Sequence, residues 1–212
     1  MLLRMSALVE VAIRDSVRAL VERDSDLALQ VIKNDRIVNE MDVHVDEECI
    51  KLLALVQPMA SDLRFITTAM KLAPDLERIA DNAVNIAERA IELNEEPILK
   101  PYVDIPYMCN IASGMVRDAI DALINRDKRL AMDVIMRDDE IDDLNDSIFQ
   151  EVTAIMTRNP ETVHRAIKVI YISKYLERIA DHATNLAEHV LFLMEGKILR
   201  HMDLGAKKFK EE

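Results

Sequence analysis

Two stretches of the sequence, one hundred residues apart, carry the same series of oxygen-bearing side chains. Each series has Glu, Asp, Asn and Glu at intervals of four, four and three residues: Glu77, Asp81, Asn85 and Glu88, and then Glu177, Asp181, Asn185 and Glu188. At about 100° per residue, each series falls within about 80° of a helix surface. Carboxylate and amide oxygens along one face suit hard cations such as Mg²⁺, Mn²⁺ or iron.

A shorter polar pair with the same four-residue spacing precedes each series. Asp35 and Asn39 form the first pair, and Asp138 and Asp142 form the second. Side chains four residues apart lie on one face of a helix. If each pair packs against the series that follows it, oxygens from two helices converge and can hold more than one ion.

A solvated acidic surface is the competing interpretation of these stripes. Like charges four residues apart on a helix repel by roughly a few tenths of a kcal/mol, so some compensation is needed. Either Arg78 and Arg178 pair with neighbouring acids, or a cation is bound. Between the two series Asn82 becomes His182, whereas the four oxygen-bearing residues are unchanged. Their retention in both copies favours a specific use.

Other candidate motifs are weaker. Glu161-Thr-Val-His164 has the E-x-x-H spacing of ferritin-like di-iron sites, but such sites need two copies and the sequence has one. A helix-capping role is therefore expected there. His182, His189 and His201 are isolated, and we expect them to be structural or solvated. No P-loop, dinucleotide fingerprint or Ser/Cys nucleophile motif is present.

The elements that position these residues are themselves duplicated. Arg14–Asp35 aligns without a gap over Arg117–Asp138, with eleven of twenty-two positions identical. Glu77–Arg89 aligns over Glu177–His189, with nine of thirteen identical, after a register shift of three residues. The chain is therefore an internal duplication of a unit of about 100 residues.

Three helices are predicted in the first repeat from apolar spacing and breakers. They cover about Leu8–Val21, Leu29–Val56 and Ser61–Leu93, and Pro58 follows the second. Ser or Asp in residues 23–26 can cap the second helix, and Ser61 or Asp62 can cap the third. Pro74 should kink or split the third helix, and the second repeat has Lys174 at that position.

The second repeat follows the same plan after a linker with three prolines. We expect its helices over residues 107–126, 128–157 and 160–194. The predicted fold is all-α, with two tandem three-helix bundles related by an internal pseudo-twofold axis. The domain boundaries follow: residues 1–94, a linker at 95–106, residues 107–196 and a charged C-terminal tail at 197–212.

Composition agrees with helices and restricts the partners. Three glycines and 4% aromatic residues do not suit a sheet protein. The net charge of −12 disfavours nucleic acid and anionic lipid. No signal peptide and no bilayer-spanning apolar run is visible, which predicts a cytoplasmic protein without membrane insertion. Cys49 and Cys109 are expected to be free, buried thiols, and a disulfide between them remains the alternative.

One pattern of residues closely resembles the PhoU family. Gln57-Pro-x-Ala-x-Asp-Leu-Arg64 is followed by Asp75-Leu-Glu-Arg-Ile-Ala-Asp81, and Leu176-Glu-Arg-Ile-Ala-Asp181 comes about a hundred residues later. The resemblance covers nearly the whole chain. It implies a fold of two similar three-helix bundles and a metal-binding regulator without enzymatic activity.

The same resemblance implies metal clusters held by paired E(D)xxxD motifs. They map to four pairs of residues: Glu77/Asp81, Asp35/Asn39, Glu177/Asp181 and Asp138/Asp142. Asn39 stands where the pattern has Asp, which lowers the expected charge of that site. Further candidates for an accessory role are Asn85, Asn185, Arg78, Arg178, Asp62 and Arg64. Iron, zinc, manganese and magnesium are the candidate metals.

The family resemblance also implies partners. It indicates a homodimer that represses the phosphate regulon when phosphate is plentiful, through the ATPase subunit of a phosphate ABC transporter and a sensor histidine kinase. Two alternatives stay open from the residues alone. One is a helical di-metal carboxylate oxidoreductase, and the other is a metal-free scaffold protein.

Overall fold

The computed structural model describes residues 1–196, and helices account for nearly all of them. In chain order they are α1 (Leu2–Val21), α2 (Ser25–Val56), α3 (Ala60–Asn94), α4 (Asp104–Asn125), α5 (Lys128–Met136), α6 (Asp138–Arg158), a 3₁₀ turn (Pro160–Thr162) and α7 (Val163–Glu195). Residues 197–212, which include the predicted charged tail and His201, lie outside the described residues.

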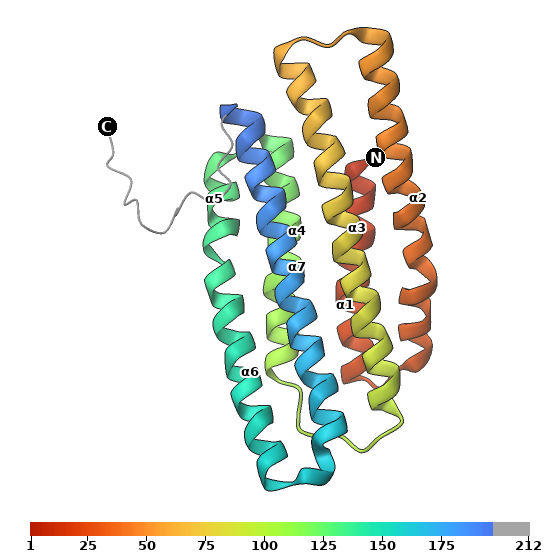
Figure 1. The fold of residues 1–212 in the computed structure, drawn as a ribbon, viewed down its shortest axis with the longest axis vertical. Coiled ribbons are helices and arrows are strands. Elements are labelled where there is room, and N and C mark those ends of the chain that lie inside the picture. Colours follow the sequence, from red (N-terminus) through yellow and green to blue (C-terminus); the bar gives the residue numbers. More distant parts are fainter. Residues whose placement is uncertain (197–212) are drawn as a thin grey trace, which may run out of the picture.

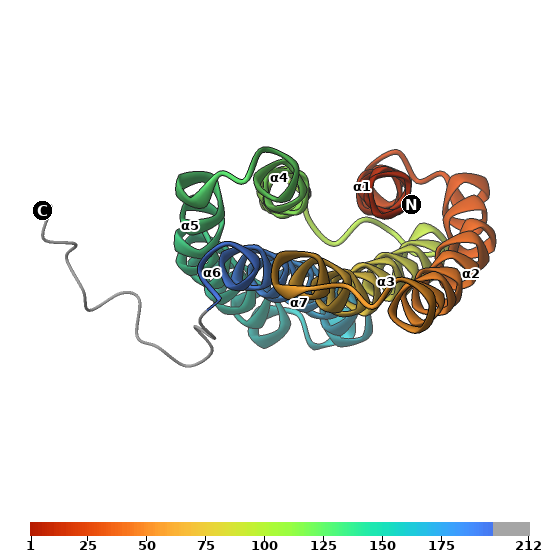
Figure 2. The same ribbon diagram turned by 90° about the horizontal axis from the view of Figure 1, so that it is seen from above.

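The helices form two bundles that lie side by side, as the duplicated sequence predicts (Figure 1). One bundle holds α1, α2 and α3, and the other holds α4, α7 and the rod made of α5 and α6. Viewed from above, α3 and α7 run next to each other in the centre, and α1 and α4 lie on the same face (Figure 2). The predicted all-α fold with two related three-helix bundles is confirmed.

The same turn opens the second helix of both bundles. Arg23 and Arg126 adopt left-handed backbone angles, with φ of 58° and 52°, and an aspartate follows each. Asp24 accepts a hydrogen bond from the backbone N–H of Leu27 at 2.9 Å, and Asp127 accepts one from the N–H of Leu130 at 3.1 Å. Each carboxylate thus caps a helix N-terminus, as predicted for Asp24.

The third helix differs from its prediction in two respects. It begins at Ala60 with Met59 as its N-cap, and neither Ser61 nor Asp62 caps it through a side chain. Pro74 does not split the helix, which is unbroken from Ala60 to Asn94, and the kink expected at Pro74 stays a prediction. The lost N–H costs one backbone hydrogen bond, and packing of α3 against α1, α2 and α7 offsets that loss.

The helix predicted over residues 128–157 is interrupted instead. Arg137 ends α5 and begins α6, and the two helices continue as one rod (Figure 1). The guanidinium of Arg137 binds Asp118 of α4 at 2.6 Å and Asp133 at 3.1 Å. Its backbone N–H is shared between the carbonyls of Asp133 and Val134, as is common where a helix tightens at its end. In the same repeat, α4 begins three residues earlier than expected, and a 3₁₀ turn precedes α7.

The core is made of the apolar faces that the helices turn toward each other. Fully buried side chains include Leu72 and Ile79 of α3 and Ile172 and Ile179 of α7. Cys49 and Cys109 are both free and buried, which confirms the thiol prediction. Among the described helices, none combines the length and the apolar character needed to cross a membrane.

The linker is fastened to both bundles. Arg23 donates hydrogen bonds to the backbone carbonyls of Asn94 and Glu96, so the end of α3 is tied to the turn between α1 and α2. On the other side Lys168 of α7 binds Glu96 at 3.0 Å, and Arg165 donates to the carbonyl of Pro97 at 2.8 Å. Salt bridges and hydrogen bonds therefore fix the segment that joins the repeats.

A polar cluster joins α3 to α7 across the repeat interface. Asp75 of α3 lies 3.0 Å from Nδ1 of His182 and 3.5 Å from Nε2 of His189, both on α7. Burial opposes ionisation of Asp75, but the hydrogen bonds from the two imidazoles prevail and hold its pKa below the usual value. The two histidines are therefore structural, as expected, with Asp75 as their partner.

Replacing Asp75 by Asn should destabilise the protein by about 1–3 kcal/mol at pH 7, because a hydrogen-bonded, largely buried carboxylate is lost. Its folded-state pKa is depressed, so the ionised group stabilises the fold above the unfolded pKa of about 4 and loses this effect as pH falls through the folded value. In urea unfolding, the difference in the free energy of unfolding between wild type and variant should be smaller at pH 3 than at pH 7. Asp62→Asn, at an exposed site, serves as the matched control. A stability difference between wild type and Asp75→Asn that does not change with pH would contradict the role given to ionised Asp75.

Candidate metal centres

The first acidic cluster lies between α2 and α3. Asp35 and Asn39 of α2 are half-buried and joined by a hydrogen bond from Nδ2 of Asn39 to Oδ2 of Asp35, 2.8 Å long. The other oxygen of each, Oδ1, is buried without a hydrogen-bond partner. Burial raises the pKa of Asp35, and the charge of Asp81 on α3 raises it further. The α2 pair therefore faces the α3 stripe, as the sequence predicts.

Asp42 belongs to this cluster, and the sequence analysis did not select it. Burial and the charge of Asp81 raise the pKa of Glu77, and the charge of Asp42 also contributes. Oδ1 of Asp42 is a third buried oxygen on α2 without a partner. The repeat alignment holds the signal, since Asn39 aligns with Asp142 and Asp42 aligns with Asn145. The first repeat thus regains one turn later the carboxylate that Asn39 lacks.

The second acidic cluster lies between α6 and α7. Burial and then the charges of Asp181 and Asp142 raise the pKa of Asp138 to about 6. Burial and the charge of Glu177 raise the pKa values of Asp142 and Asp181 as well. All four predicted acids of this repeat are thus brought within electrostatic range of one another, and the mutual repulsion is not fully relieved by local cations.

The break at Arg137 helps to place Asp138. Because α6 begins there, Asp138 lies in the first turn of a helix together with Asp139 and Glu140. Carboxylates are favoured at this end by the helix dipole, by about 0.3–1 kcal/mol each. That contribution partly offsets the cost of holding Asp138 against the acids of α7.

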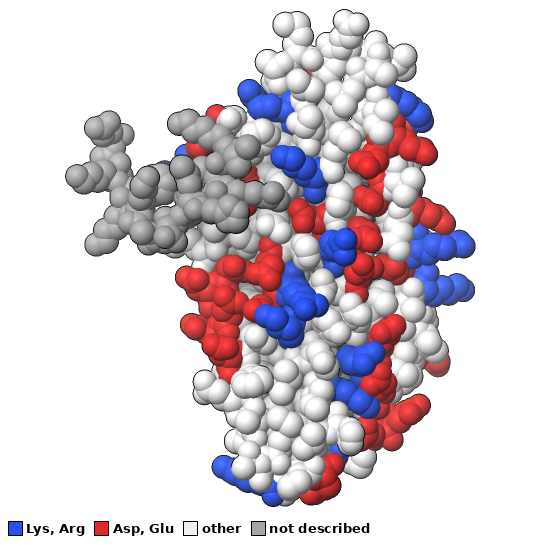
Figure 3. All heavy atoms as spheres, in the orientation of Figure 1, with Lys and Arg blue, Asp and Glu red and all other residues white. Residues whose placement is uncertain are grey.

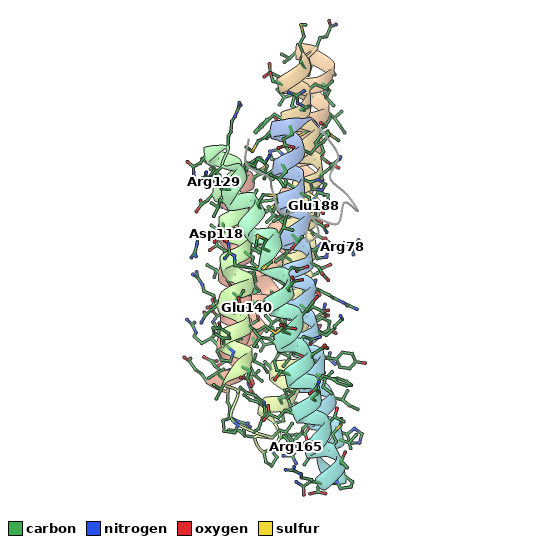
Figure 4. All side chains as sticks on the ribbon, turned by 90° about the vertical axis from the view of Figure 1, so that its left-hand side faces the viewer. Arg78, Asp118, Arg129, Glu140, Arg165 and Glu188 are labelled. Atoms are coloured by element: carbon green, nitrogen blue, oxygen red, sulfur yellow. The ribbon has the colours of Figure 1, made fainter. Side chains whose placement is uncertain are left out.

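Built-in cations differ between the two clusters. Lys174, the counterpart of Pro74, forms an ion pair with Glu177 in the second cluster. In the first cluster Arg78 lies 3.7 Å from Glu77, and the Arg78 side chain is 66% exposed. Figure 4 shows Arg78 projecting from the side of the molecule opposite to Asp118 of α4. The local pairing predicted for Arg78 is present but weak, because exposed ion pairs contribute little.

The remaining accessory candidates divide into two groups. Asn85 and Asn185 are half-buried on the same stripes as the acids, and Arg178 lies over the ring of Tyr175 at 5.9 Å. Asp62 and Arg64 are not brought to either cluster. They lie at the start of α3, and fifteen residues of helix, about 22 Å, separate Asp62 from Glu77.

Glu161 and His164 do not form a metal site with the stripes. Both are exposed at the turn between α6 and α7, where Glu161 lies in the 3₁₀ turn. That turn is separated from Glu177 by four turns of α7, or about 20 Å. The E-x-x-H motif lies at a helix start, but the capping role expected for it is wrong, because no side chain caps the 3₁₀ turn or α7 through a hydrogen bond.

The residues fit a hard cation by donor type and charge, but their side chains do not converge on one point. Across residues 1–196, no group of three or more His, Cys, Asp or Glu side chains is arranged to hold a metal ion. The fit rests on buried oxygens without partners on α2 and on carboxylates whose pKa values are raised by burial first and by repulsion second. A cation would supply the missing counter-charge once side-chain rotations bring these oxygens together.

Acidic side chains gather in two areas of one face of the molecule. In Figure 3, acidic side chains gather over α2 and α3 on the right and over α6 and α7 on the left, with basic side chains between them. The opposite face is formed by α1 and α4 (Figure 2).

Comparison with known sequences finds one family along most of the chain. The model of the PhoU domain matches residues 2–90 and 105–190. A phosphate-specific transport system accessory protein PhoU homologue from Pseudomonas putida is 43% identical over 204 residues, which cover 96% of this chain and 80% of the relative. The homologue from Aquifex aeolicus is 41% identical over 205 residues, covering 97% and 93%.

Solved structures agree with the sequence matches. The crystal structure of PhoU from Pseudomonas aeruginosa superposes with a TM-score of 0.89 at 40% identity, covering 92% of this chain and 94% of that one. The phosphate transport system regulatory protein PhoU from Streptococcus pneumoniae gives a TM-score of 0.87 at 27% identity, covering 93% of each chain.

Replacing Asp138 by Asn should stabilise the metal-free protein at pH 7.5 by about 1–2 kcal/mol, after allowance for solvent screening of a half-exposed group. The folded pKa of about 6 exceeds the unfolded value, so ionised Asp138 destabilises the fold fully above pH 6 and not at all below about pH 4. Urea unfolding of wild type and Asp138→Asn at pH 7.5 and at pH 4 measures this gain in the free energy of unfolding. Asp139→Asn controls for the helix dipole, and equal gains in the two variants would contradict the repulsion argument.

Proposed function

Because this chain belongs to the PhoU family, we propose that it is an accessory regulator of phosphate transport that represses the phosphate-starvation response when phosphate is plentiful. The family is one of accessory regulatory proteins without enzymatic activity. Support for the proposal comes from the PhoU match in both repeats, together with relatives named for the phosphate-specific transport system. A cytoplasmic location is part of the proposal.

Metal binding at the two acidic clusters is the finer part of the proposal. In the first repeat Asp35, Asp42, Glu77 and Asp81 would hold the cation, with Asn39 as a neutral donor. In the second repeat the donors would be Asp138, Asp142, Glu177 and Asp181. A bound hard cation supplies positive charge between two helices. The carboxylates would then tie α2 to α3 and α6 to α7 through their oxygens.

The alternative of a di-metal oxidoreductase has little support. Its single E-x-x-H motif lies at an exposed turn, away from both clusters. A hard divalent or trivalent ion in an all-oxygen environment suits a structural or regulatory role, and iron, manganese, magnesium and zinc remain the candidates.

An adaptor role follows from the placement of the charges. Acidic side chains gather over both pairs of helices on one face of the molecule, so they form an extended surface for a basic partner (Figure 3). A bound cation could bridge this surface to acidic or phosphorylated groups as well. The ATPase subunit of a phosphate ABC transporter and a sensor histidine kinase are the proposed partners, and the regulator is proposed to act as a homodimer.

Metal binding predicts a rise in stability that depends on the clusters. Protein purified without a tag or chelator should contain metal by elemental analysis, and re-addition of Mn²⁺ or Fe²⁺ to stripped protein should raise the free energy of unfolding by about 3 kcal/mol at a hundredfold excess over Kd. Glu77→Gln combined with Glu177→Gln should abolish both effects. Glu88→Gln, at an exposed position on the same helix, is the control. A substoichiometric metal content that none of the three substitutions changes would favour a metal-free scaffold.

The regulatory role predicts a clear phenotype. Deletion of the gene in its host should switch on a phosphate-starvation reporter in phosphate-rich medium, and the wild-type gene should restore repression. The Glu77→Gln, Glu177→Gln double variant should restore it only in part if metal is required, at protein levels matched by immunoblot. Full repression in the deletion strain would rule out the proposed function.

A further inference from the structure

The two acidic clusters differ at one position in the third helix of each repeat. Lys174 of α7 aligns with Pro74 of α3. At about 100° per residue, Lys174 lies within about 20° of Asp181 on the surface of α7. It therefore lies in line with the acidic stripe of the second repeat, one turn before Glu177. Proline carries no charge, so the first repeat has no cation at the equivalent position.

Lys174 acts on three acids of the second cluster. Its ammonium forms an ion pair with Glu177, whose side chain is 15% exposed. Burial and the charge of Glu177 raise the pKa values of Asp142 on α6 and Asp181 on α7, and the charge of Lys174 lowers both in part. The ammonium is therefore close enough to both helices to neutralise part of the negative charge between them.

The arginines beside the clusters do not account for this difference, because each repeat has one at the same position. Arg78 and Arg178 are equivalent in the alignment of the repeats. Arg78 lies 3.7 Å from Glu77 with its side chain 66% exposed, and Arg178 lies over the ring of Tyr175 at 5.9 Å. Lys174 is therefore a cation that the second repeat has in addition to the arginine.

The carboxylates of the two clusters are otherwise matched in number. The first has Asp35, Asp42, Glu77 and Asp81, and the second has Asp138, Asp142, Glu177 and Asp181. A cation gains less on entering a site in which an ammonium already neutralises part of the charge. It must also displace that ammonium from Glu177. The Lys174 side chain is 46% exposed, so the ammonium can turn into solvent when a metal ion takes its place.

We infer that Lys174 is a tethered counter-ion that lowers the metal affinity of the second cluster, so that the first repeat binds metal before the second as the metal concentration rises. The inference rests on the metal binding proposed above. At a low metal concentration α2 and α3 are tied together, and α6 and α7 follow at a higher one. The regulator then has three states, namely empty, loaded in the first repeat and loaded in both.

Two variants of the full-length protein isolate the clusters. Glu177→Gln with Asp181→Asn leaves the first cluster intact, and Glu77→Gln with Asp81→Asn leaves the second intact. Mn²⁺ added to metal-stripped protein is the probe, and the electron paramagnetic resonance signal of the free ion gives the Kd. The variant with the first cluster should bind Mn²⁺ about tenfold more tightly, since a unit charge about 6 Å from a divalent ion changes the binding constant by roughly that factor in water.

Substitutions of the lysine test its role directly. In the variant with the second cluster, Lys174→Gln should tighten Mn²⁺ binding about tenfold, whereas Lys174→Arg keeps the charge and should leave the Kd unchanged. Arg158→Gln removes a positive charge from the exposed end of α6, about 24 Å along the helix from Asp142, and should have no effect. Equal Mn²⁺ affinities with and without Lys174→Gln would overturn the inference and leave the proposed metal binding intact.

The reciprocal exchange introduces the lysine into the first repeat. In the variant with the first cluster, Pro74→Lys should weaken Mn²⁺ binding about tenfold. Pro74→Gln restores the same backbone N–H without a charge, so it separates the effect of the lysine from that of losing the proline. Equal affinities of these two variants would also overturn the inference. If the wild-type protein bound no Mn²⁺ at either cluster, the proposed metal binding would fail, and the inference with it.

Discussion

Repulsion between carboxylates held face to face is the interaction on which the functional part of this structure depends. Apolar packing brings α2 against α3 and α6 against α7, and the acids of each pair of helices are carried along. Packing elsewhere in the bundle thereby holds each cluster together, and burial of the carboxylates, followed by their repulsion, raises the pKa values of Glu77 and Asp138. A protein stable enough to bear the cost of this repulsion holds a region of negative potential, which a cation or a basic partner can relieve at neutral pH.

The two repeats keep this arrangement while varying its parts. Asn39 and Asp42 of α2 align with Asp142 and Asn145 of α6. Each pair therefore supplies one carboxylate and one amide, but at exchanged positions. The basic side chains next to the two clusters differ more. Lys174 pairs with Glu177 in the second cluster, and proline stands at the equivalent position, Pro74, in the first repeat. The clusters therefore share a charge type and differ in how much of that charge the protein neutralises itself.

Much of the fold and of the acidic clusters could be predicted from the sequence, because the patterns of apolar and acidic residues are periodic and occur in both repeats. The repeats, the helices and the facing of Asp35 toward Asp81 all follow from spacing. Other features depend on contacts between distant residues, which periodicity does not encode. The break at Arg137 depends on Asp118 of another helix, and the pairing of His182 depends on Asp75 in the other repeat.

The contact of Asp75 with His182 and His189 also bears on how a duplicated protein can change. In a symmetric dimer of single repeats, every residue on one side of the axis would face the same sequence on the other, so one substitution would alter two places at once. Fusion removes that restriction. In this chain Asp75 has Tyr175 as its counterpart, and His182 has Asn82. The interface between the repeats is thus asymmetric, because the two surfaces that meet there carry different residues at equivalent positions.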